Sequence, residues 1–269
     1  MSESTPTRHI LSISGGKDSA ALAVYMRDRV SNMEYVFCDT GKELPETYDY
    51  LGKLEAYLGK PIIRLNAERG FDHWLQVYNG FLPSPRTRWC TRQLKIKPFE
   101  DYVGNDRVVS YIGIRADEDR EGYVSSKSNI TAVYPFREDR IVKADVYRIL
   151  EESGVGIPSY YEWRTRSGCY FCFFQRKAEW VGLLERHPDL YESAKAYEKT
   201  DEATGESYTW TKGESLTDLA TRKDQILARH ERELAKERQR TPKHLPLVEA
   251  LAEALDTEND DEACLICRL

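Results

Sequence analysis

The chain has 269 residues, of which 41% are hydrophobic and 31% charged, a composition typical of soluble globular proteins and not of disordered chains. Its 39 basic and 45 acidic residues give a net charge of −6, which excludes a uniformly basic nucleic-acid-binding surface but is compatible with a local basic groove. No apolar run approaches the roughly 20 residues of a membrane-spanning helix, and the residues before Ile10 lack the regions of a signal peptide. We therefore expect a cytoplasmic protein that makes no membrane contact.

Short apolar runs in the first half of the chain predict β-strands, and helix-length segments separate them. The predicted strands are His9–Ser14, Glu34–Asp39, Pro61–Leu65 and Arg107–Ile114. Helical patterns cover Ala20–Met26 and the segment from Pro45 to Leu58. Strands joined by helices imply right-handed crossovers, so we expect an α/β fold with a parallel, Rossmann-like sheet that is covered on both faces.

The α/β pattern weakens near Glu152, where the segment 153–158 is rich in glycine and ends in proline. Further helical patterns follow at 179–199 and 216–240, with a polar loop between them. The last of these contains a segment of alternating charge, 229–240, that predicts an exposed helix. We therefore predict an α/β domain at residues 1–155, a cysteine-bearing and mainly helical region at 156–255, and an acidic, flexible tail at 256–269.

The segment Ser14-Gly-Gly-Lys-Asp-Ser19 lies between the first predicted strand and the first predicted helix. Its glycines let the backbone approach phosphate oxygens, the unpaired N–H groups of the helix point at the anion, and Lys17 adds a positive charge. The spacing is neither that of a Walker A loop nor that of a dinucleotide-binding fingerprint. An isolated Gly-Gly-Lys would fit an ordinary turn equally well, but the position of this segment favours a pyrophosphate-binding loop.

This segment matches every fixed position of the Ser-Gly-Gly-x-Asp-Ser signature, so the chain resembles the PP-loop ATP pyrophosphatases. Those enzymes cleave ATP between its α and β phosphates and form an adenylated intermediate. The resemblance implies an adenine nucleotide alpha-hydrolase-like fold, with ATP and Mg²⁺ as ligands. It implies catalytic roles for Lys17, Asp18 and Asp39. The nucleotide-binding residues that it implies are Ser12, Ser14, Gly15, Gly16, Lys17, Asp18, Ser19, Thr40 and Gly41.

Two later motifs resemble the phosphoadenylyl-sulfate reductase group within that superfamily. One is Phe37-Cys-Asp-Thr-Gly-Lys-Glu-Leu-Pro-Glu-Thr47, and the other is Gly113-Ile-Arg-Ala-Asp-Glu-Asp-Arg120. By this resemblance, Asp18 and Asp39 lie near magnesium-bound phosphates. Substrate anions are faced by Lys95, Arg115 and Arg120, which without these motifs would be read as a solvated charged surface.

Cys169 and Cys172 form a C-x2-C pair, and Cys90 precedes a basic segment about eighty residues upstream. In the iron–sulfur reductases, two adjacent cysteines at the upstream position combine with such a pair to hold a [4Fe–4S] cluster. Here Trp89 replaces the first of them, so the resemblance implies three ligands, Cys90, Cys169 and Cys172. Three ligands leave one iron open to a sulfide that is to be transferred.

The cluster's fourth ligand is unknown, with Cys264 and Cys267 of the tail as candidates. A structural zinc ion and buried free thiols are the alternatives to the cluster. The tail pair could instead have a redox or persulfide-carrying role. Cys38, inside the second predicted strand, is expected to be a core residue.

These motifs predict an ATP pyrophosphatase and sulfurtransferase that converts ATP to AMP and pyrophosphate and adenylates a substrate oxygen for sulfur insertion. The chain resembles the adenylating component of DNA phosphorothioation, a phage-defence modification, which implies a cysteine desulfurase as sulfur donor and DNA or a DNA-modifying complex as partner. One alternative is a phosphoadenylyl- or adenylyl-sulfate reductase, which would release no pyrophosphate from ATP. Another is a non-catalytic ATP-sensing module of a larger complex. The sequence does not distinguish DNA, tRNA and a small molecule as the sulfur acceptor.

Overall fold

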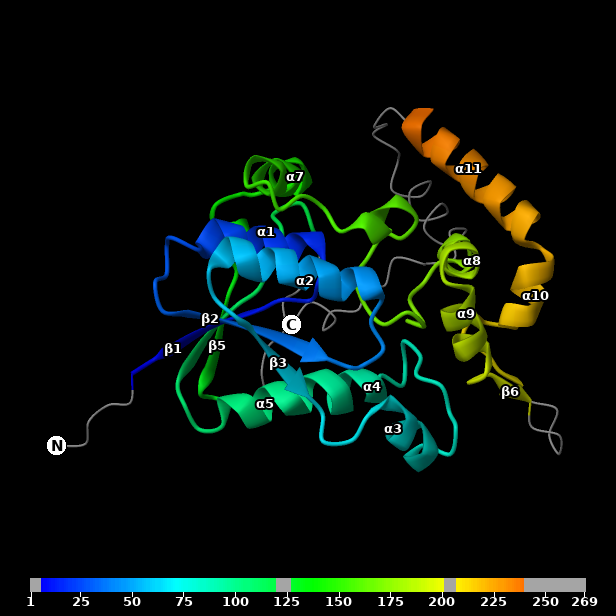
Figure 1. The fold of residues 1–269 in the computed structure, drawn as a ribbon, viewed down its shortest axis with the longest axis horizontal. Helices are drawn as coiled ribbons and strands as arrows, with labels where there is room; N and C mark the ends of the chain where they lie inside the picture. Colours follow the sequence, from blue (N-terminus) through cyan, green and yellow to red (C-terminus); the bar gives the residue numbers. More distant parts are fainter. Residues whose placement is uncertain (1–5, 120–126, 201–206, 240–269) are drawn as a thin grey trace, which may run out of the picture. The chain divides into compact units, whose positions relative to one another are not determined.

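The structure is a computed structural model that describes residues 6–119, 127–200 and 207–239 (Figure 1). The described residues form two compact units. An α/β unit contains residues 6–79, 88–119 and 127–169, and a helical unit contains residues 80–87, 170–200 and 207–239. Arg120, Cys264, Cys267 and the predicted tail at 256–269 lie outside the described residues.

Five parallel strands form the sheet of the α/β unit, in the order β3-β2-β1-β4-β5. Their bounds are Arg8–Ser12 for β1, Met33–Asp39 for β2, Ile62–Asn66 for β3, Val108–Tyr111 for β4 and Ile130–Val133 for β5. The central strand β1 pairs with β2 on one side and with β4 on the other. The chain order therefore reverses at β1, and ligands of α/β proteins bind at such a switch point, beyond the carboxyl ends of the strands. The predicted parallel α/β fold is confirmed.

Helices cover both faces of this sheet (Figure 1). One face carries α1 at Lys17–Met26, α2 at Pro45–Leu58 and α7 at Lys143–Glu152. The other side carries α3 at Phe71–Val77, α4 at Trp89–Thr91, the π-helix η1 at Arg92–Ile96 and α5 at Lys97–Val103. The short helix α6 at Pro135–Glu138 and the 3-10 helix η2 at Ser159–Glu162 belong to the same unit.

Successive side chains along each strand point to opposite faces of the sheet, so a hydrophobic core forms on each face. Leu11 and Tyr35 pack in the cluster under α1 and α2, whereas their neighbours Ile10 and Val36 pack in the cluster under α5. This is the side-chain period of two that a β-strand imposes. Cys38 belongs to the second cluster, and burial raises the pKa of its thiol to about 11, which confirms that it is a core residue.

Four helices and a two-stranded antiparallel ribbon make up the helical unit. The helices are α8 at Lys177–Arg186, α9 at Pro188–Lys195, α10 at Leu216–Thr221 and α11 at Lys223–Gln239, and the strands are β6 at Lys199–Thr200 and β7 at Ser207–Tyr208. Their core contains the rings of Trp180, Tyr191 and Trp210.

The two helical segments predicted in this region are each divided. The segment 179–199 forms α8 and α9, which meet at His187, because Pro188 has no N–H to continue the first helix. The segment 216–240 forms α10 and α11, which meet at Arg222, and the last of its residues, Arg240, lies outside the described part of the chain.

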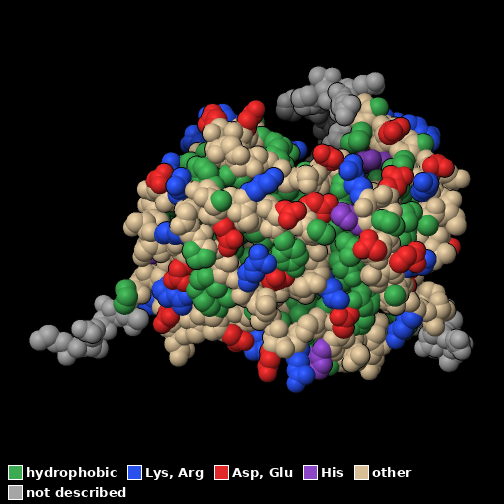
Figure 2. Space-filling view, viewed as in Figure 1, with side chains coloured by type: hydrophobic (Ala, Val, Ile, Leu, Met, Phe, Trp, Pro, Cys, Tyr) green, Lys and Arg blue, Asp and Glu red, His purple; other side chains and the backbone are tan. Residues whose placement is uncertain are grey.

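The surface is mixed in charge. On the face shown in Figure 2, acidic and basic side chains are interspersed, in keeping with the net charge of −6. Arg229 and Glu233 form an i,i+4 ion pair at 2.7 Å on α11. Within the part of the chain that the structure describes, no helix is long and apolar enough to cross a membrane.

Candidate functional site

The phosphate loop, residues Ser14–Ser19, joins the carboxyl end of β1 to the first turn of α1. Gly15 has φ +77°, and a β-carbon there would lie 2.6 Å from Cγ2 of Thr47. Backbone conformation and close packing therefore both require glycine at this position. Gly16 is the N-cap of α1, and it has no side chain that could bond to the first N–H groups of the helix. These N–H groups therefore point outward along the helix axis.

Two serines fix the shape of the loop. The Ser19 hydroxyl lies 3.0 Å from the backbone N–H of Ser14, which donates to it, and donates to the Gly16 carbonyl at 3.1 Å. The Ser14 hydroxyl accepts a bond from the N–H of Gly16 at 3.4 Å. These bonds close within the loop and fix the conformation of its backbone.

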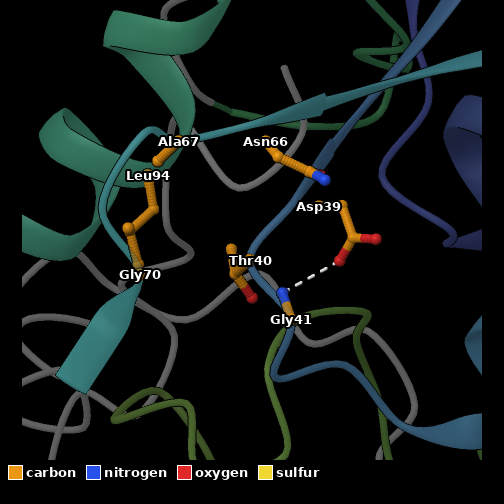
Figure 3. A pocket seen from close by; sticks show the side chains of 7 residues that line it. All are labelled: Asp39, Thr40, Gly41, Asn66, Ala67, Gly70 and Leu94. Carbon is orange, nitrogen blue, oxygen red and sulfur yellow. Dashed lines mark hydrogen bonds between the residues drawn. The ribbon is translucent and has the colours of Figure 1, made fainter. Parts of the chain in front are cut away.

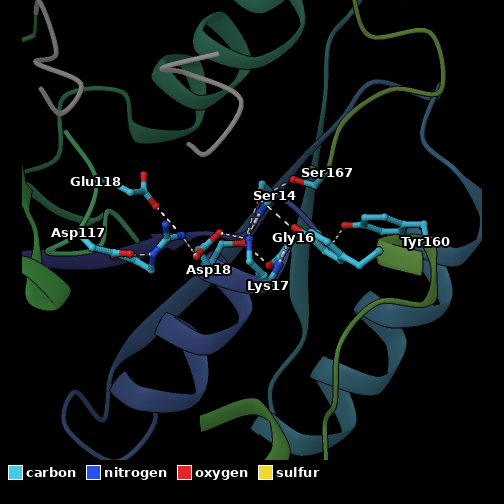
Figure 4. Close-up of polar contacts among 12 residues, drawn as sticks. Ser14, Gly16, Lys17, Asp18, Asp117, Glu118, Tyr160 and Ser167 are labelled. Carbon is cyan, nitrogen blue, oxygen red and sulfur yellow. Dashed lines mark hydrogen bonds and ion pairs between the residues drawn. The ribbon is translucent and has the colours of Figure 1, made fainter. Parts of the chain in front are cut away.

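A segment about 150 residues downstream holds the same loop from outside (Figure 4). The Tyr160 hydroxyl donates to the Gly15 carbonyl at 2.8 Å, and the Ser167 hydroxyl donates to the Ser14 hydroxyl at 3.2 Å. Burial raises the pKa of Tyr160 well above its usual value, so the hydroxyl stays protonated and able to donate. These contacts bring the end of the α/β unit's chain onto the predicted nucleotide loop.

Lys17 and Asp18 lie in a row of charges that continues to Asp117 and Glu118 (Figure 4), and Arg115 joins the two pairs. Lys17 Nζ is 3.1 Å from one oxygen of Asp18, and Arg115 Nη1 is 2.6 Å from the other. Arg115 also contacts Asp117 at 2.9 Å and Glu118 at 2.7 Å. Burial would lower the pKa of Arg115, but attraction to Asp18 and the hydrogen bonds that the guanidinium donates to Asp18 and Asp117 outweigh this effect and raise the pKa. Arg115 therefore binds carboxylates here, and its predicted contact with a substrate anion stays a prediction.

A pocket of about 190 Å³ lies at the carboxyl ends of β2 and β3 (Figure 3). Three of the predicted site residues, Asp39, Thr40 and Gly41, line it. Asn66 at the end of β3 and Leu94 of η1 complete much of the remaining wall. The pocket thus combines a carboxylate, an amide and an apolar side chain, as small-molecule sites commonly do.

Asp39 is oriented by its neighbours. Its Oδ1 accepts bonds from the Gly41 N–H at 2.9 Å and from the Tyr48 hydroxyl at 2.8 Å. Burial, and then the bond to Asp39, raise the pKa of Tyr48, so this hydroxyl remains a donor. Arg64 lies 4.0 Å from the other oxygen. Tyr48 was predicted as part of the apolar face of α2, and nothing in the sequence indicated that its hydroxyl also donates a hydrogen bond to Asp39.

Thr40 connects the pocket to a predicted metal ligand. Its hydroxyl donates to Oε1 of Glu43 at 2.9 Å and lies 3.2 Å from the sulfur of Cys169, which in turn lies 3.7 Å from the same Glu43 oxygen. Glu43 is 6% exposed, and its second oxygen is buried with no hydrogen-bond partner within the described residues. A buried carboxylate oxygen without a partner is costly and is uncommon outside functional sites.

Two other predicted residues are buried near the same strand ends. Lys95 lies on the π-helix η1, and its carbonyl accepts a bond from Cys38 at 3.5 Å. Such helices occur often at functional sites. Ser12 is buried at the end of β1, and its hydroxyl has no partner among the residues described.

The predicted cluster ligands are divided between the two units. Cys90 on α4 and Cys169 belong to the α/β unit, whereas Cys172 is a buried residue of the helical unit. Trp89, which replaces a cysteine, is buried in a stack between Phe71 and Tyr78. Within residues 6–119, 127–200 and 207–239, no group of three or more His, Cys, Asp or Glu is arranged to hold a metal ion. The iron–sulfur cluster and its zinc alternative therefore stay predictions.

Tyr161 accepts a hydrogen bond from the backbone N–H of Lys17 at 3.3 Å. Several residues of this site were not predicted from the sequence: Tyr48, Glu43, Asn66, Leu94, Tyr160, Tyr161 and Ser167. Glu43 stands inside the motif that begins at Phe37, and Ser167 stands two residues before Cys169, so their neighbours gave a signal. The two tyrosines of η2 carry no local signal, because only the fold brings them to the loop.

Comparison with known proteins places this site in a family. Residues 8–172 match the model of the phosphoadenosine phosphosulfate reductase domain. An uncharacterized protein of Methanocaldococcus jannaschii is 26% identical over 196 residues, which are 67% of this chain and 45% of that protein. The tRNA-specific 2-thiouridylase MnmA of Pediococcus pentosaceus is 25% identical over 193 residues, 58% of this chain and 50% of that protein. The chain thus spans about half the length of these relatives or less.

A solved structure, the phosphoadenylyl-sulfate reductase of Candida auris in its phosphate complex, is similar with a TM-score of 0.49 and 16% identity. The similarity covers 61% of this chain and 82% of that one. The family model extends from β1 to the C-x2-C pair and thus contains the phosphate loop, the pocket and Arg115. Because it covers more than half of the sequence, this chain belongs to the phosphoadenosine phosphosulfate reductase domain family.

Proposed function

We propose that this chain is an ATP pyrophosphatase that adenylates a substrate oxygen so that sulfur can replace it. The observation that carries the proposal is the phosphate loop, a preformed turn at the start of α1 that bears Lys17 and is held by bonds within itself. Membership of a family named for a sulfur-transforming enzyme, and similarity to a thiouridylase, support the same class of chemistry.

The reaction needs no nucleophile from the enzyme. The substrate oxygen attacks the α-phosphorus of ATP, the bond from that phosphorus to the bridging oxygen breaks, and pyrophosphate leaves. Negative charge grows on the leaving group, and the N–H groups at the start of α1 together with the Lys17 ammonium are placed to stabilise it. The pocket beside Thr40 and Gly41 would hold the rest of the nucleotide.

Two carboxylates have the chemistry that magnesium requires, because this ion prefers oxygen ligands. Asp39 and Asp18 would hold it, and when bound with ATP it neutralises charge on the phosphates. Asp39 is partly exposed and held by Gly41 and Tyr48, whereas Asp18 is buried between Lys17 and Arg115. Arg115 would thus position Asp18 for its part in the site.

For the acceptor, we propose a non-bridging oxygen of a DNA phosphate, as in phosphorothioate modification. A phosphate oxygen is a poor leaving group until adenylation makes it part of AMP. The sulfur would come from a cysteine desulfurase, with Cys90, Cys169 and Cys172 as sulfur-handling or cluster-binding thiols. Anaerobic purification with iron, sulfide and zinc analysis decides between cluster and zinc.

The test is magnesium-dependent release of pyrophosphate from ATP. We expect Lys17→Ala to lower kcat/KM by about 100-fold or more, because it removes a charge that stabilises the leaving group. Lys53→Ala, on the exposed side of α2, is the matched control and should behave as the unmodified protein. Turnover of phosphoadenylyl sulfate without pyrophosphate release from ATP would instead identify a reductase.

The acceptor is tested in a second assay. DNA, tRNA or neither is added to the protein with a cysteine desulfurase, cysteine, a thiol reductant that supplies the two electrons for each persulfide sulfur, Mg²⁺ and ATP, and the nucleic acid is digested and examined by mass spectrometry. Phosphorothioate-linked dinucleotides are the expected product. Thiolated tRNA nucleosides in their place would assign a tRNA acceptor and remove the DNA proposal.

A further inference from the structure

Two hydroxyl groups lie directly over the backbone of the phosphate loop. A β-carbon at Gly16 would be 2.7 Å from the Ser167 hydroxyl and 3.1 Å from the Tyr161 hydroxyl. The N–H of Lys17, the first residue of α1, donates to the Tyr161 hydroxyl at 3.3 Å, and the Lys17 ammonium lies 5.0 Å from the centre of the Tyr161 ring. Tyr161 therefore engages both groups of Lys17 that an incoming phosphate would use.

A phosphate oxygen and the Tyr161 hydroxyl compete for the same donor. An N–H group at a helix start attracts an anion, and a charged oxygen is a stronger acceptor than a neutral hydroxyl. We propose that the Tyr161 hydroxyl occupies the position of a phosphate oxygen while the loop holds no nucleotide, and that it is displaced when pyrophosphate or ATP binds. Tyr161 is then an affinity-determining residue of the loop, an inference that rests on the proposed function because it assumes a phosphate ligand.

The displacement extends to Cys169 because the intervening chain is tightly held. Arg164 is 1% exposed, and its guanidinium donates to the carbonyls of Gly168 at 3.1 Å and of Cys169 at 2.8 Å. Ser167, between them, bonds to Ser14 of the loop. These bonds hold residues 164–169 together, so we expect a ligand that displaces Ser167 from the loop to shift Cys169 as well.

Cys169 has contacts that such a shift would change. Its sulfur lies 3.2 Å from the Thr40 hydroxyl and 3.7 Å from Glu43, at the edge of the nucleotide pocket. Occupancy of the phosphate loop is thereby coupled to the surroundings of the thiol. Cys169 is half-buried in the structure, and release of its contacts with Thr40 and Glu43 would make the sulfur more accessible once the nucleotide is in place.

Binding of inorganic pyrophosphate, measured by calorimetry, tests the role of Tyr161. Tyr161→Phe keeps the ring over Lys17 but removes the competing oxygen, so it should bind pyrophosphate roughly two- to tenfold more tightly, the worth of one ordinary hydrogen bond. Tyr147→Phe, an exposed tyrosine on α7, is the matched control and should bind like the unmodified protein. Equal or weaker binding by Tyr161→Phe overturns the proposal, as does a lack of binding by both proteins.

Alkylation of Cys169 by iodoacetamide, followed by peptide mass spectrometry, tests the coupling. Pyrophosphate should increase the alkylation rate of Cys169 in the unmodified protein, and an unchanged or slower rate contradicts the coupling. Both measurements use the binding of pyrophosphate and not the turnover of ATP, so their outcome does not depend on whether the protein releases pyrophosphate from ATP. If the protein releases no pyrophosphate from ATP, the proposed function fails, while tighter binding by Tyr161→Phe would still support the inference. Thermal unfolding of each variant confirms that it is folded.

Discussion

At the scale of single residues, Gly15 shows how the phosphate loop depends on one backbone angle. Its φ of +77° lies in the left-handed region, which costs other residues about 1–2 kcal/mol. Gly59, at the end of α2, has a similar φ of +64°. The difference is the space around them, because a β-carbon at Gly59 would meet nothing within 4 Å, whereas one at Gly15 would meet Thr47.

This pair gives a matched prediction. Gly59→Ala should reduce the free energy of unfolding by about 1 kcal/mol through its backbone angle alone. Gly15→Ala should cost roughly 1–3 kcal/mol more, because Thr47 or the loop has to shift as well. Urea denaturation of both variants measures the difference. Equal losses of stability would show that the contact with Thr47 carries no strain.

The site residues that could be identified from the sequence are those that stand within a few residues of one another in a motif. The pattern from Ser14 to Ser19 predicted the loop, and the motif that begins at Phe37 identified Asp39, Thr40 and Gly41 as candidate site residues, which line the pocket. Tyr160, Tyr161 and Ser167 escaped prediction because more than 140 residues separate them from the loop. No periodicity reports a contact at that distance along the chain.

At the scale of elements, one arginine joins three parts of the α/β unit. Arg8 on β1 contacts Glu34 on β2 at 2.6 Å and Asp106, which follows α5, at 3.0 Å. Tyr102 of α5 donates to the same Glu34 carboxylate at 2.6 Å. The bond from Arg8 lowers the pKa of Glu34, burial opposes it, and the bond from Tyr102 lowers the pKa further.

This network predicts how stability depends on pH. Because the pKa of Glu34 is lower in the folded protein, its contribution is present above the unfolded value and is lost as pH falls through the folded value. Glu34→Gln should therefore destabilise the protein at about pH 6 and much less at about pH 3. Glu151→Gln on the exposed surface of α7 is the control. A constant gap between Glu34→Gln and the unmodified protein at both pH values would contradict this account.

Element prediction succeeded where the pattern was strong. The strands β1 to β4 and the helices α1 and α2 fall within a few residues of the predicted ranges. β5 was missed although three of its four residues are apolar; the run is short, and none of its residues is fully buried. The divisions at Pro188 and Arg222 were also missed, although Pro188 is itself a sequence signal that a helix ends at the residue before it.

At the scale of the whole molecule, a ligand of the phosphate loop is expected to stabilise one of the two units more than the other. The phosphate loop and the pocket belong to the α/β unit, and the aromatic core around Trp180 belongs to the helical unit. Binding to the folded state stabilises it by an amount that grows with ligand concentration, about 2.7 kcal/mol at a hundred times the dissociation constant.

Hydrogen exchange with and without pyrophosphate tests where this stabilisation acts. We expect slower exchange in peptides from β1, the loop and α1, and little change in peptides from α8 and α11. Protection confined to the helical unit would place the anion site elsewhere. A nucleotide-free sample kept at the same ionic strength with sodium chloride is the control, since it separates specific protection from a general salt effect.

Because Cys38 is buried, the rate at which a thiol reagent labels it reports how often the fold around it opens. At neutral pH its thiol stays protonated and enclosed between the sheet and α5, so a reagent in the solvent must wait for the sheet to open. Its labelling rate then reports how often the structure around Cys38 opens, and no engineered cysteine is needed. The labelling rate of this buried, protonated thiol is therefore a measure of how long the native structure around it persists.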